Sequence, residues 1–289
     1  MPYLAAFPGA LLPRRCTRTA HPMIYPALVE ARARGRKLLA VLIDPDKARR
    51  DHLGQLAAYA EAGQVDYFLW GGSLVNQPQA EYYLRLLKSM TSRPILLFPG
   101  SVYQLDAEAD GLLLLSLLSG RNPDLLIGRH VTVAGRIKQM GLETIPTGYL
   151  LIDGGRPTSV TYMSNTAPIP ADKPGIAVAT ALAGEQLGLR VIYMDAGSGA
   201  NQPISAELIG AVRQEVELPI IVGGGIRSPE RAALALTAGA DMVVVGNGLE
   251  NDANWLPKLA AAVRECGTGE PDTLPDPPVR SKAVRQVAE

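Results

Sequence analysis

The chain alternates short, continuously apolar runs with longer segments in which apolar residues recur at helical spacing. Apolar runs without polar alternation are typical of strands that are buried on both faces, as in a parallel sheet covered by helices. The runs predict strands at residues 38–43, 67–70, 95–98, 112–115, 149–152, 191–194, 220–222 and 242–245.

Helical segments separate most of these runs, among them residues 51–61, 80–90, 125–140, 177–187, 205–215 and 229–238. Eight buried strands with intervening helices predict an α/β fold, a closed (β/α)8 barrel of the TIM type. An open, doubly wound sheet is the alternative. Residues 101–110 are too few for a full helix with two loops, so we expect one helix of the barrel to be reduced.

Three stretches lie outside this rhythm. Residues 153–175 contain four prolines and no strand or helix pattern, which predicts a long functional loop or lid. Residues 1–22 are predicted to be a disordered or mis-started extension, with Met23 as an alternative start, and residues 267–289 a disordered tail. We therefore expect one catalytic barrel domain over residues 23–266.

The composition excludes several classes of function. The 28 basic and 28 acidic side chains cancel, so no global positive field attracts nucleic acid. Cys16 and Cys266 form no ligand pattern and suggest a reducing cytoplasm rather than a disulfide framework. The longest apolar run, residues 112–118, is too short to span a bilayer.

Glycine-rich motifs follow the last three predicted strands. They are Gly197-Ser198-Gly199 after the sixth, Gly223-Gly224-Gly225 after the seventh and Gly246-Asn247 after the eighth. Glycine lets backbone N–H groups approach an anion, and barrels often bind phosphate between the loops after strands seven and eight. The simpler interpretation is that these glycines only permit tight turns. Motifs at three consecutive strand ends favour a phosphate site.

Acidic and hydroxyl side chains follow the first two strands. Asp44 is the first charge after a wholly apolar strand, and Ser73 follows Gly71-Gly72 after the second. A carboxylate and a hydroxyl at the barrel mouth can hold Mg²⁺ together with substrate phosphates. Alternatively, Asp44 serves as an N-cap. Asp46 and Lys47 are expected to cap and flank the next helix.

Tyr193 and Asp195 are two positions apart on the sixth strand and therefore point to the same face. A phenol and a carboxylate side by side can bind the hydroxyl groups of a polyol. The alternative is a core tyrosine beside a turn aspartate, which the adjoining glycine motif makes the weaker interpretation.

Together these motifs resemble the geranylgeranylglyceryl phosphate synthase family, prenyltransferases with a modified TIM barrel. The resemblance extends from about residue 23 to 262 and is carried by residues 42–47, 71–73, 193–199, 223–226 and 245–247. It implies a reaction between sn-glycerol 1-phosphate and a long allylic diphosphate, with geranylgeranyl diphosphate as the expected donor. An ether forms at the glycerol 3-hydroxyl, diphosphate leaves, and Mg²⁺ is the cofactor.

The resemblance also assigns roles by position. Asp44 and Ser73 would hold the metal, Tyr193 and Asp195 would be the catalytic pair, and Tyr149 would lie beside the prenyl channel. The glycerol phosphate site would comprise Tyr193, Met194, Asp195, Ala196, Gly197, Ser198, Gly199, Gly224, Gly225, Gly246 and Asn247. Some members carry Lys where Leu42 stands, and its replacement by Leu fits the branch of larger archaeal and Bacteroidetes-type enzymes. The chain departs from the family at Asp195, where members often carry Glu. Homo-oligomers (dimers or hexamers) and transient membrane contact for release of the lipid product are further implications.

Two rival functions remain open from the sequence. Another phosphate-binding barrel, such as a sugar-phosphate isomerase or a flavin-binding oxidoreductase, shares the glycine loops but gives no reason for Asp44, Ser73 and the Tyr193–Asp195 pair together. A non-catalytic binding barrel would tolerate the loss of Asp44.

Overall fold

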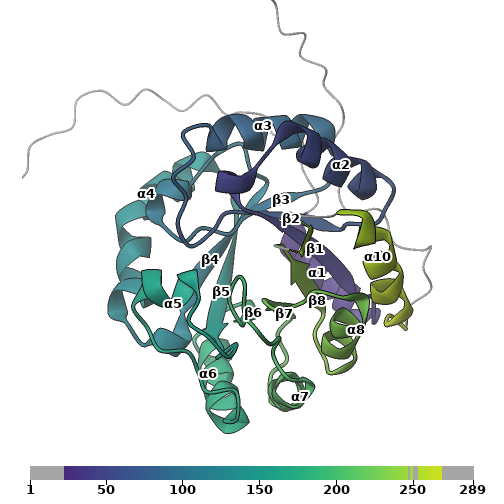
Figure 1. Cartoon of the computed structure of the whole chain (residues 1–289). Coiled ribbons are helices and arrows are strands. Elements are labelled where there is room, and N and C mark those ends of the chain that lie inside the picture. The colour runs from purple at the N-terminus through teal and green to yellow at the C-terminus, as the bar shows by residue number, and fades with distance from the viewer. Residues whose placement is uncertain (1–22, 247, 250–252, 269–289) are drawn as a thin grey trace, which may run out of the picture.

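The computed structural model describes residues 23–246, 248–249 and 253–268. Eight parallel strands form a closed barrel in sequence order, with β8 paired to β1 (Figure 1). The strands are β1 (Leu38–Ile43), β2 (Tyr67–Trp70), β3 (Ile95–Leu97), β4 (Gly111–Leu117), β5 (Glu143–Leu151), β6 (Val191–Asp195), β7 (Ile220–Gly223) and β8 (Met242–Val245). The predicted (β/α)8 barrel is confirmed, and the open sheet is excluded.

The helices around the barrel are α2 (Arg50–Glu61), α3 (Ala80–Met90), α4 (Arg129–Met140), α5 (Ser159–Ser164), α6 (Pro174–Gln186), α7 (Ala206–Glu215), α8 (Pro229–Thr237) and α10 (Leu256–Glu265) (Figure 1). The first helix, α1 (Ile24–Ala33), instead lies across one end of the barrel, where Ile24, Leu28 and Ala31 pack with the side chains of the barrel interior. Between β3 and β4 lies only the single 3-10 turn η2 (Val102–Gln104), as the short connection predicted.

Two local expectations were wrong. The stretch 153–175 contains the short helix α5, which starts directly after Thr158 and ends at Asn165 in the left-handed conformation. The helix expected at 125–140 is divided into a π-helical segment, η4 (Asp124–Gly128), and α4.

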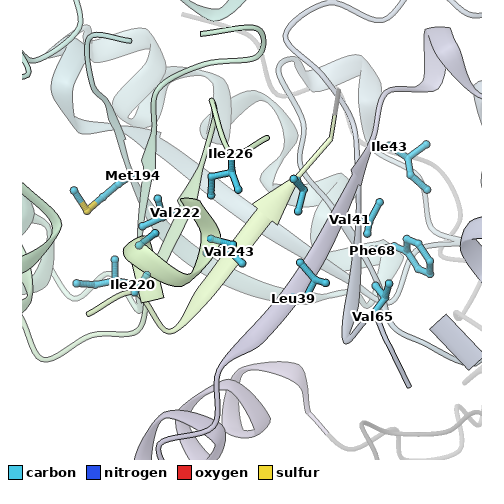
Figure 2. Close-up of a cluster of buried hydrophobic side chains, with 14 of the residues drawn as sticks. Leu39, Val41, Ile43, Val65, Phe68, Met194, Ile220, Val222, Ile226 and Val243 are labelled. Atoms are coloured by element: carbon cyan, nitrogen blue, oxygen red, sulfur yellow. The ribbon is translucent and has the colours of Figure 1, made fainter. Parts of the chain in front are cut away.

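Successive side chains of each strand point alternately away from and into the barrel, which creates two apolar layers. On β1, Leu39, Val41 and Ile43 pack outward under the helices, whereas Leu38 and Ala40 fill the barrel interior. Figure 2 shows part of the outer layer, where side chains of β1 and β8 face away from the barrel axis. Because the side-chain period of a strand is two, the same alternation decides which polar residues face the interior at the strand ends.

The expected ends of the domain lie largely outside the described residues. Residues 1–22 and 269–289 belong to that part, so the two predicted disordered segments stay predictions. Gly267 and Thr268 are described, and the Thr268 N–H donates to the Gly35 carbonyl at 3.2 Å. Among the described helices, none has the length and apolar character needed to cross a membrane.

Candidate active site

The interior face of β6 carries the two side chains that the sequence pairs as catalytic. Tyr193 is 1% exposed and Asp195 is 8% exposed, and both belong to the inward-facing set of this strand. The predicted common orientation is therefore found. Asp195 stands at the last position of β6, where the interior of the barrel opens into its mouth.

Tyr149 reaches the same carboxylate from the neighbouring strand β5. Tyr149 is paired with Tyr193 in the β5–β6 register, one inward position below Asp195. Its hydroxyl donates a hydrogen bond to Asp195 Oδ2, while the Gly197 N–H donates to Asp195 Oδ1 at 2.8 Å. The sequence assigned Tyr149 to a prenyl channel and gave no sign of this contact.

An aromatic stack surrounds the carboxylate. The Tyr149 and Tyr193 rings are stacked with centroids 5.5 Å apart, and the Phe98 ring stacks on Tyr193 at 4.8 Å. Phe98 was missed in the sequence as a site residue, although it lies at the carboxyl end of the third apolar run. The stack fixes the ring planes of both tyrosines.

Burial dominates the electrostatics of this group. It raises the pKa of the Asp195 carboxyl, and the hydrogen bonds from Tyr149 and Gly197 act in the opposite direction. Burial, followed by the charge of Asp195, raises the pKa of Tyr149 and of Tyr193 well above the usual range. The two phenols therefore stay protonated, and the carboxylate is the group suited to accept a proton.

The glycine triplet after β7 fits closely around these side chains. A Cβ at Gly223 would lie 2.6 Å from the Tyr193 hydroxyl, and one at Gly224 would lie 2.6 Å from Asp195 Oδ1. Gly224 also has φ +80°, a conformation that other residues rarely adopt. Gly224 is thus required beside the carboxylate itself, in addition to any contact with an anion.

Arginine side chains connect the glycine-rich loops. Arg227 donates to the Ala200 carbonyl at 2.8 Å and to the Gly199 carbonyl at 3.3 Å, which links the β7–α8 loop to the β6–α7 loop. Arg231 donates to the Gly225 carbonyl at 3.0 Å. Neither arginine was predicted as a site residue, although Arg227 stands two positions after the triplet.

The other predicted phosphate ligands are arranged around the same mouth. Gly197 packs against Thr158, which precedes α5, so the long β5–α6 connection covers the β6–α7 loop. Gly246 lies beside Leu42, since a Cβ there would be 3.3 Å from the Leu42 carbonyl oxygen. Asn247 lies outside the described residues, so its part in the site stays a prediction.

The predicted metal residues lie on neighbouring loops. Asp44 Oδ1 accepts the Asp46 N–H at 3.0 Å and caps the turn η1 (Pro45–Lys47), and Lys47 Nζ lies 3.8 Å from Asp44 Oδ2. A Cβ at Gly72 would be 3.6 Å from Asp44 Oδ1, so the carboxylate lies against the residue that precedes Ser73. Asp44 is therefore an N-cap whose carboxylate also faces the loop of Ser73.

Asp44 and Ser73 offer oxygen ligands of the kind that Mg²⁺ prefers. Within the described residues, no group of three or more His, Cys, Asp or Glu side chains is placed to hold a metal. One carboxylate and one hydroxyl match Mg²⁺, which keeps several waters and binds phosphate oxygens.

Asp46 does not cap the following helix as expected. Its carboxylate accepts the backbone N–H of Asn76 at 2.8 Å and of Gln77 at 2.7 Å. The N-cap of α2 is instead Arg49, which makes no side-chain capping bond. Asp46 consequently ties the loop that follows β2 to the loop that follows β1.

A parallel barrel with glycine-rich loops after three consecutive strands and a buried carboxylate between them defines a phosphate-binding β/α-barrel enzyme. Comparison with known proteins assigns the chain to one family within this class. The chain belongs to the PcrB family, whose model matches residues 32–265.

Curated relatives match nearly their whole length. The chain is 53% identical over 231 residues to the geranylgeranylglyceryl phosphate synthase of Spirosoma linguale, covering 80% of this chain and 93% of that protein. It is 51% identical over 243 residues to the geranylgeranylglyceryl phosphate synthase of Chitinophaga pinensis, covering 84% and 96%.

A solved structure agrees with the sequence relatives. The (S)-3-O-geranylgeranylglyceryl phosphate synthase of Thermoplasma acidophilum, in complex with sn-glycerol 1-phosphate, superposes with a TM-score of 0.79 at 31% identity. The alignment covers 84% of this chain and 99% of that chain. The resemblance inferred from the motifs is confirmed. The chain is an enzyme of the prenyltransferase class, and the rival barrel functions are set aside.

Proposed function

We propose that this prenyltransferase joins the 3-hydroxyl of sn-glycerol 1-phosphate to a long-chain prenyl diphosphate, with geranylgeranyl diphosphate as the donor and Mg²⁺ as the cofactor. The observation that carries the proposal is the buried Asp195 carboxylate, held directly beside glycine-rich loops. The relative from Thermoplasma acidophilum, solved with sn-glycerol 1-phosphate, supports the acceptor.

The acceptor phosphate binds to the loops after β6, β7 and β8. Backbone N–H groups of Ser198, Gly199, Gly224 and Gly225, with Gly246 and the amide of Asn247, supply the donors. Gly197 lines the same loop, while its own N–H donates to Asp195 Oδ1. The α7 and α8 helices begin just beyond these loops, and their N-terminal dipoles favour an anion. The glycerol hydroxyl then points toward Tyr193 and Asp195, with Met194 and Ala196 providing the intervening backbone.

The donor diphosphate binds on the side of the mouth formed by β1 and β2. Strand order in the closed barrel places these strands across from β5 and β6, so the two substrates meet head to head over the barrel interior. Asp44 and Ser73 would hold Mg²⁺ against the diphosphate, where it would neutralise the charge of the leaving group.

The transfer exchanges one carbon–oxygen bond for another. The acceptor oxygen forms a bond to the allylic C1 carbon, and the bond from C1 to the diphosphate oxygen breaks, with its electron pair leaving on diphosphate. The hydroxyl proton passes to Asp195, which is the only carboxylate on the interior face of β6. Holding both substrates in this orientation supplies the entropic part of the rate.

The prenyl tail is placed along apolar side chains between β4 and α5. Leu115, Leu125 and Val160 are partly buried and pack against the inner layer, to which Tyr149 also belongs. Leu113 and Leu117 of the same strand are buried core residues.

A direct assay tests the proposal. Purified protein is incubated with Mg²⁺, sn-glycerol 1-phosphate and farnesyl, geranylgeranyl or heptaprenyl diphosphate, and the products are identified by mass spectrometry. We expect a phosphoglycerol ether, formed fastest from the geranylgeranyl donor. No ether with any donor, from folded protein, would refute the proposal, while sn-glycerol 3-phosphate serves as the stereochemical control.

Location and assembly are part of the proposal. A cytoplasmic enzyme is supported by the cysteine usage, since Cys16 and Cys266 form no disulfide framework or ligand pattern in the sequence. Self-association into dimers or hexamers is supported by Ile127 and Val131, which are 62% and 70% exposed on the η4–α4 surface. Light scattering of the purified protein measures the assembly directly, and a purely monomeric species would contradict it.

A further inference from the structure

The hydrogen bond between Tyr149 and Asp195 crosses from β5 to β6 inside the barrel. Tyr149 is 5% exposed, and its hydroxyl donates to Asp195 Oδ2. The other carboxylate oxygen, Oδ1, accepts the Gly197 N–H. Each carboxylate oxygen therefore has one protein donor. One donor comes from β5 and the other from the loop after β6, and together they fix the plane of the carboxylate.

We propose that Tyr149 is a positioning residue of the transfer reaction, whose hydroxyl fixes Asp195 Oδ2 toward the acceptor and stabilises the ionised carboxylate. This inference rests on the assignment of Asp195 as the proton acceptor. It assigns Tyr149 a role in the acceptor half of the site, beyond contact with the prenyl chain.

The stacked rings make the donor rigid. The Tyr149 ring stacks on the Tyr193 ring with an interplanar angle of 18°. The centroid of the Phe98 ring lies 6.0 Å from that of Tyr149 and 4.8 Å from that of Tyr193. A ring held on its face loses rotational freedom, so its phenol oxygen is held at one place beside the carboxylate. A donor in a fixed place restricts the carboxylate to one rotamer before the acceptor binds.

The surroundings of Asp195 make its ionisation depend on the Tyr149 hydroxyl. Around the carboxylate lie the Tyr149 phenol from β5 and the backbone of Gly197 and Gly224, and the Tyr193 phenol of the same strand is close enough to be affected by its charge. Burial raises the pKa of Asp195, and the Tyr149 hydrogen bond is the first opposing contribution. Removing that bond raises the pKa further, so the protonated, inactive carboxyl persists to higher pH.

The test compares Tyr149→Phe with the parent enzyme in single-turnover rates, measured with enzyme in excess across a pH series. We expect the rate at neutral pH to fall roughly tenfold, as for a lost hydrogen bond to a charged group. The acidic limb of the profile should move upward by about one pH unit. The KM for sn-glycerol 1-phosphate should stay within about twofold, because no phosphate contact is lost.

Tyr67→Phe is the matched control. Tyr67 lies on β2 in the inner apolar layer and is 2% exposed, so the variant also removes a buried phenol hydroxyl from the barrel interior. Its pH profile should equal that of the parent. A purely structural effect of hydroxyl removal would lower rates in both variants without moving the acidic limb.

A second variant retains the packing. Replacing Tyr149 with a fluorinated tyrosine keeps the ring and makes the hydroxyl a stronger donor, so the acidic limb should move to lower pH. An unchanged acidic limb in both Tyr149 variants would overturn the inference.

Asp195→Asn separates the role of Asp195 from that of Tyr149. If this variant keeps its turnover, the proton-acceptor role of Asp195 fails. If only the pH profiles of the Tyr149 variants fail to move, the positioning role of Tyr149 alone is wrong.

Discussion

The carboxylate of Asp46 accepts the backbone N–H of Asn76 at 2.8 Å, although the two residues belong to different loops of the barrel mouth. Asp46 lies in η1 after β1, and Asn76 lies in the connection after β2. The same carboxylate accepts the Gln77 N–H. The proposed metal residues Asp44 and Ser73 stand on these two loops, so this bond controls how closely they approach.

Asp46→Ala should therefore weaken metal use without removing a metal ligand. We expect the Mg²⁺ concentration for half-maximal rate to rise roughly threefold to tenfold, because charge-assisted bonds to two backbone N–H groups are lost. Titration of activity with Mg²⁺ measures this effect. Asp172→Asn, an exposed carboxylate change before α6, is the control and should leave the titration unchanged. An Asp46→Ala curve identical to the control would contradict the loop-coupling argument.

Asp44→Asn separates capping from metal binding. Asparagine keeps an oxygen that can accept the Asp46 N–H and is as good an N-cap as aspartate, so η1 and the fold should persist. The charge that holds Mg²⁺ is lost, and we expect turnover to fall about 100-fold or more. Circular dichroism checks the fold, and rates at limiting and saturating Mg²⁺ check the role. A variant with parental rates at limiting Mg²⁺ would show that Asp44 is a cap alone.

Apolar patterning predicted the barrel because strands buried on both faces leave a continuous signal in the sequence. It did not predict the first half of β5, which contains Pro146 and Gly148. Pro146 is tolerated because pairing with β6 begins only at Thr147, so its missing N–H removes no bond of that ladder. The Pro146 carbonyl still accepts the Arg190 N–H.

The candidate site likewise contains features that the sequence predicted and features that it did not. Tyr193 and Asp195 were predictable as a pair because two residues at spacing two on one strand share a face. The Tyr149–Asp195 bond joins residues 46 positions apart, and it depends on the β5–β6 register that pairs Tyr149 with Tyr193. Likewise, the contact of Arg227 with the loop after β6 arises only when the strand ends meet at one mouth.

A protein comprising residues 23–268 should keep the stability and activity of the full chain. The Ile24 and Tyr25 N–H groups donate to the Glu143 carboxylate at 2.5 and 2.8 Å, which caps α1 without any earlier residue. We expect the melting temperature to stay within about 2 °C. A shorter protein that ends at Glu265 also loses the bond between Thr268 and Gly35 and should melt lower. A large loss of stability in the 23–268 protein would show that one removed end packs on the barrel.

Arg227→Ala tests the orientation of the two substrates. The guanidinium bonds to the Gly199 and Ala200 carbonyls, so its loss frees the β6–α7 loop from the β7–α8 loop. If these loops hold the glycerol phosphate, the KM for sn-glycerol 1-phosphate should rise roughly tenfold, as expected for one or two lost charge-assisted bonds. The KM for the prenyl diphosphate should stay within about twofold. Arg85→Ala, which breaks only a surface pair with Glu81 on α3, is the control and should change neither constant.

Because both substrates carry phosphate groups, the opposite pattern is equally measurable. If Arg227→Ala raised the KM for the prenyl diphosphate and spared that for glycerol phosphate, the donor would occupy these loops and the placement proposed for the two substrates would be reversed.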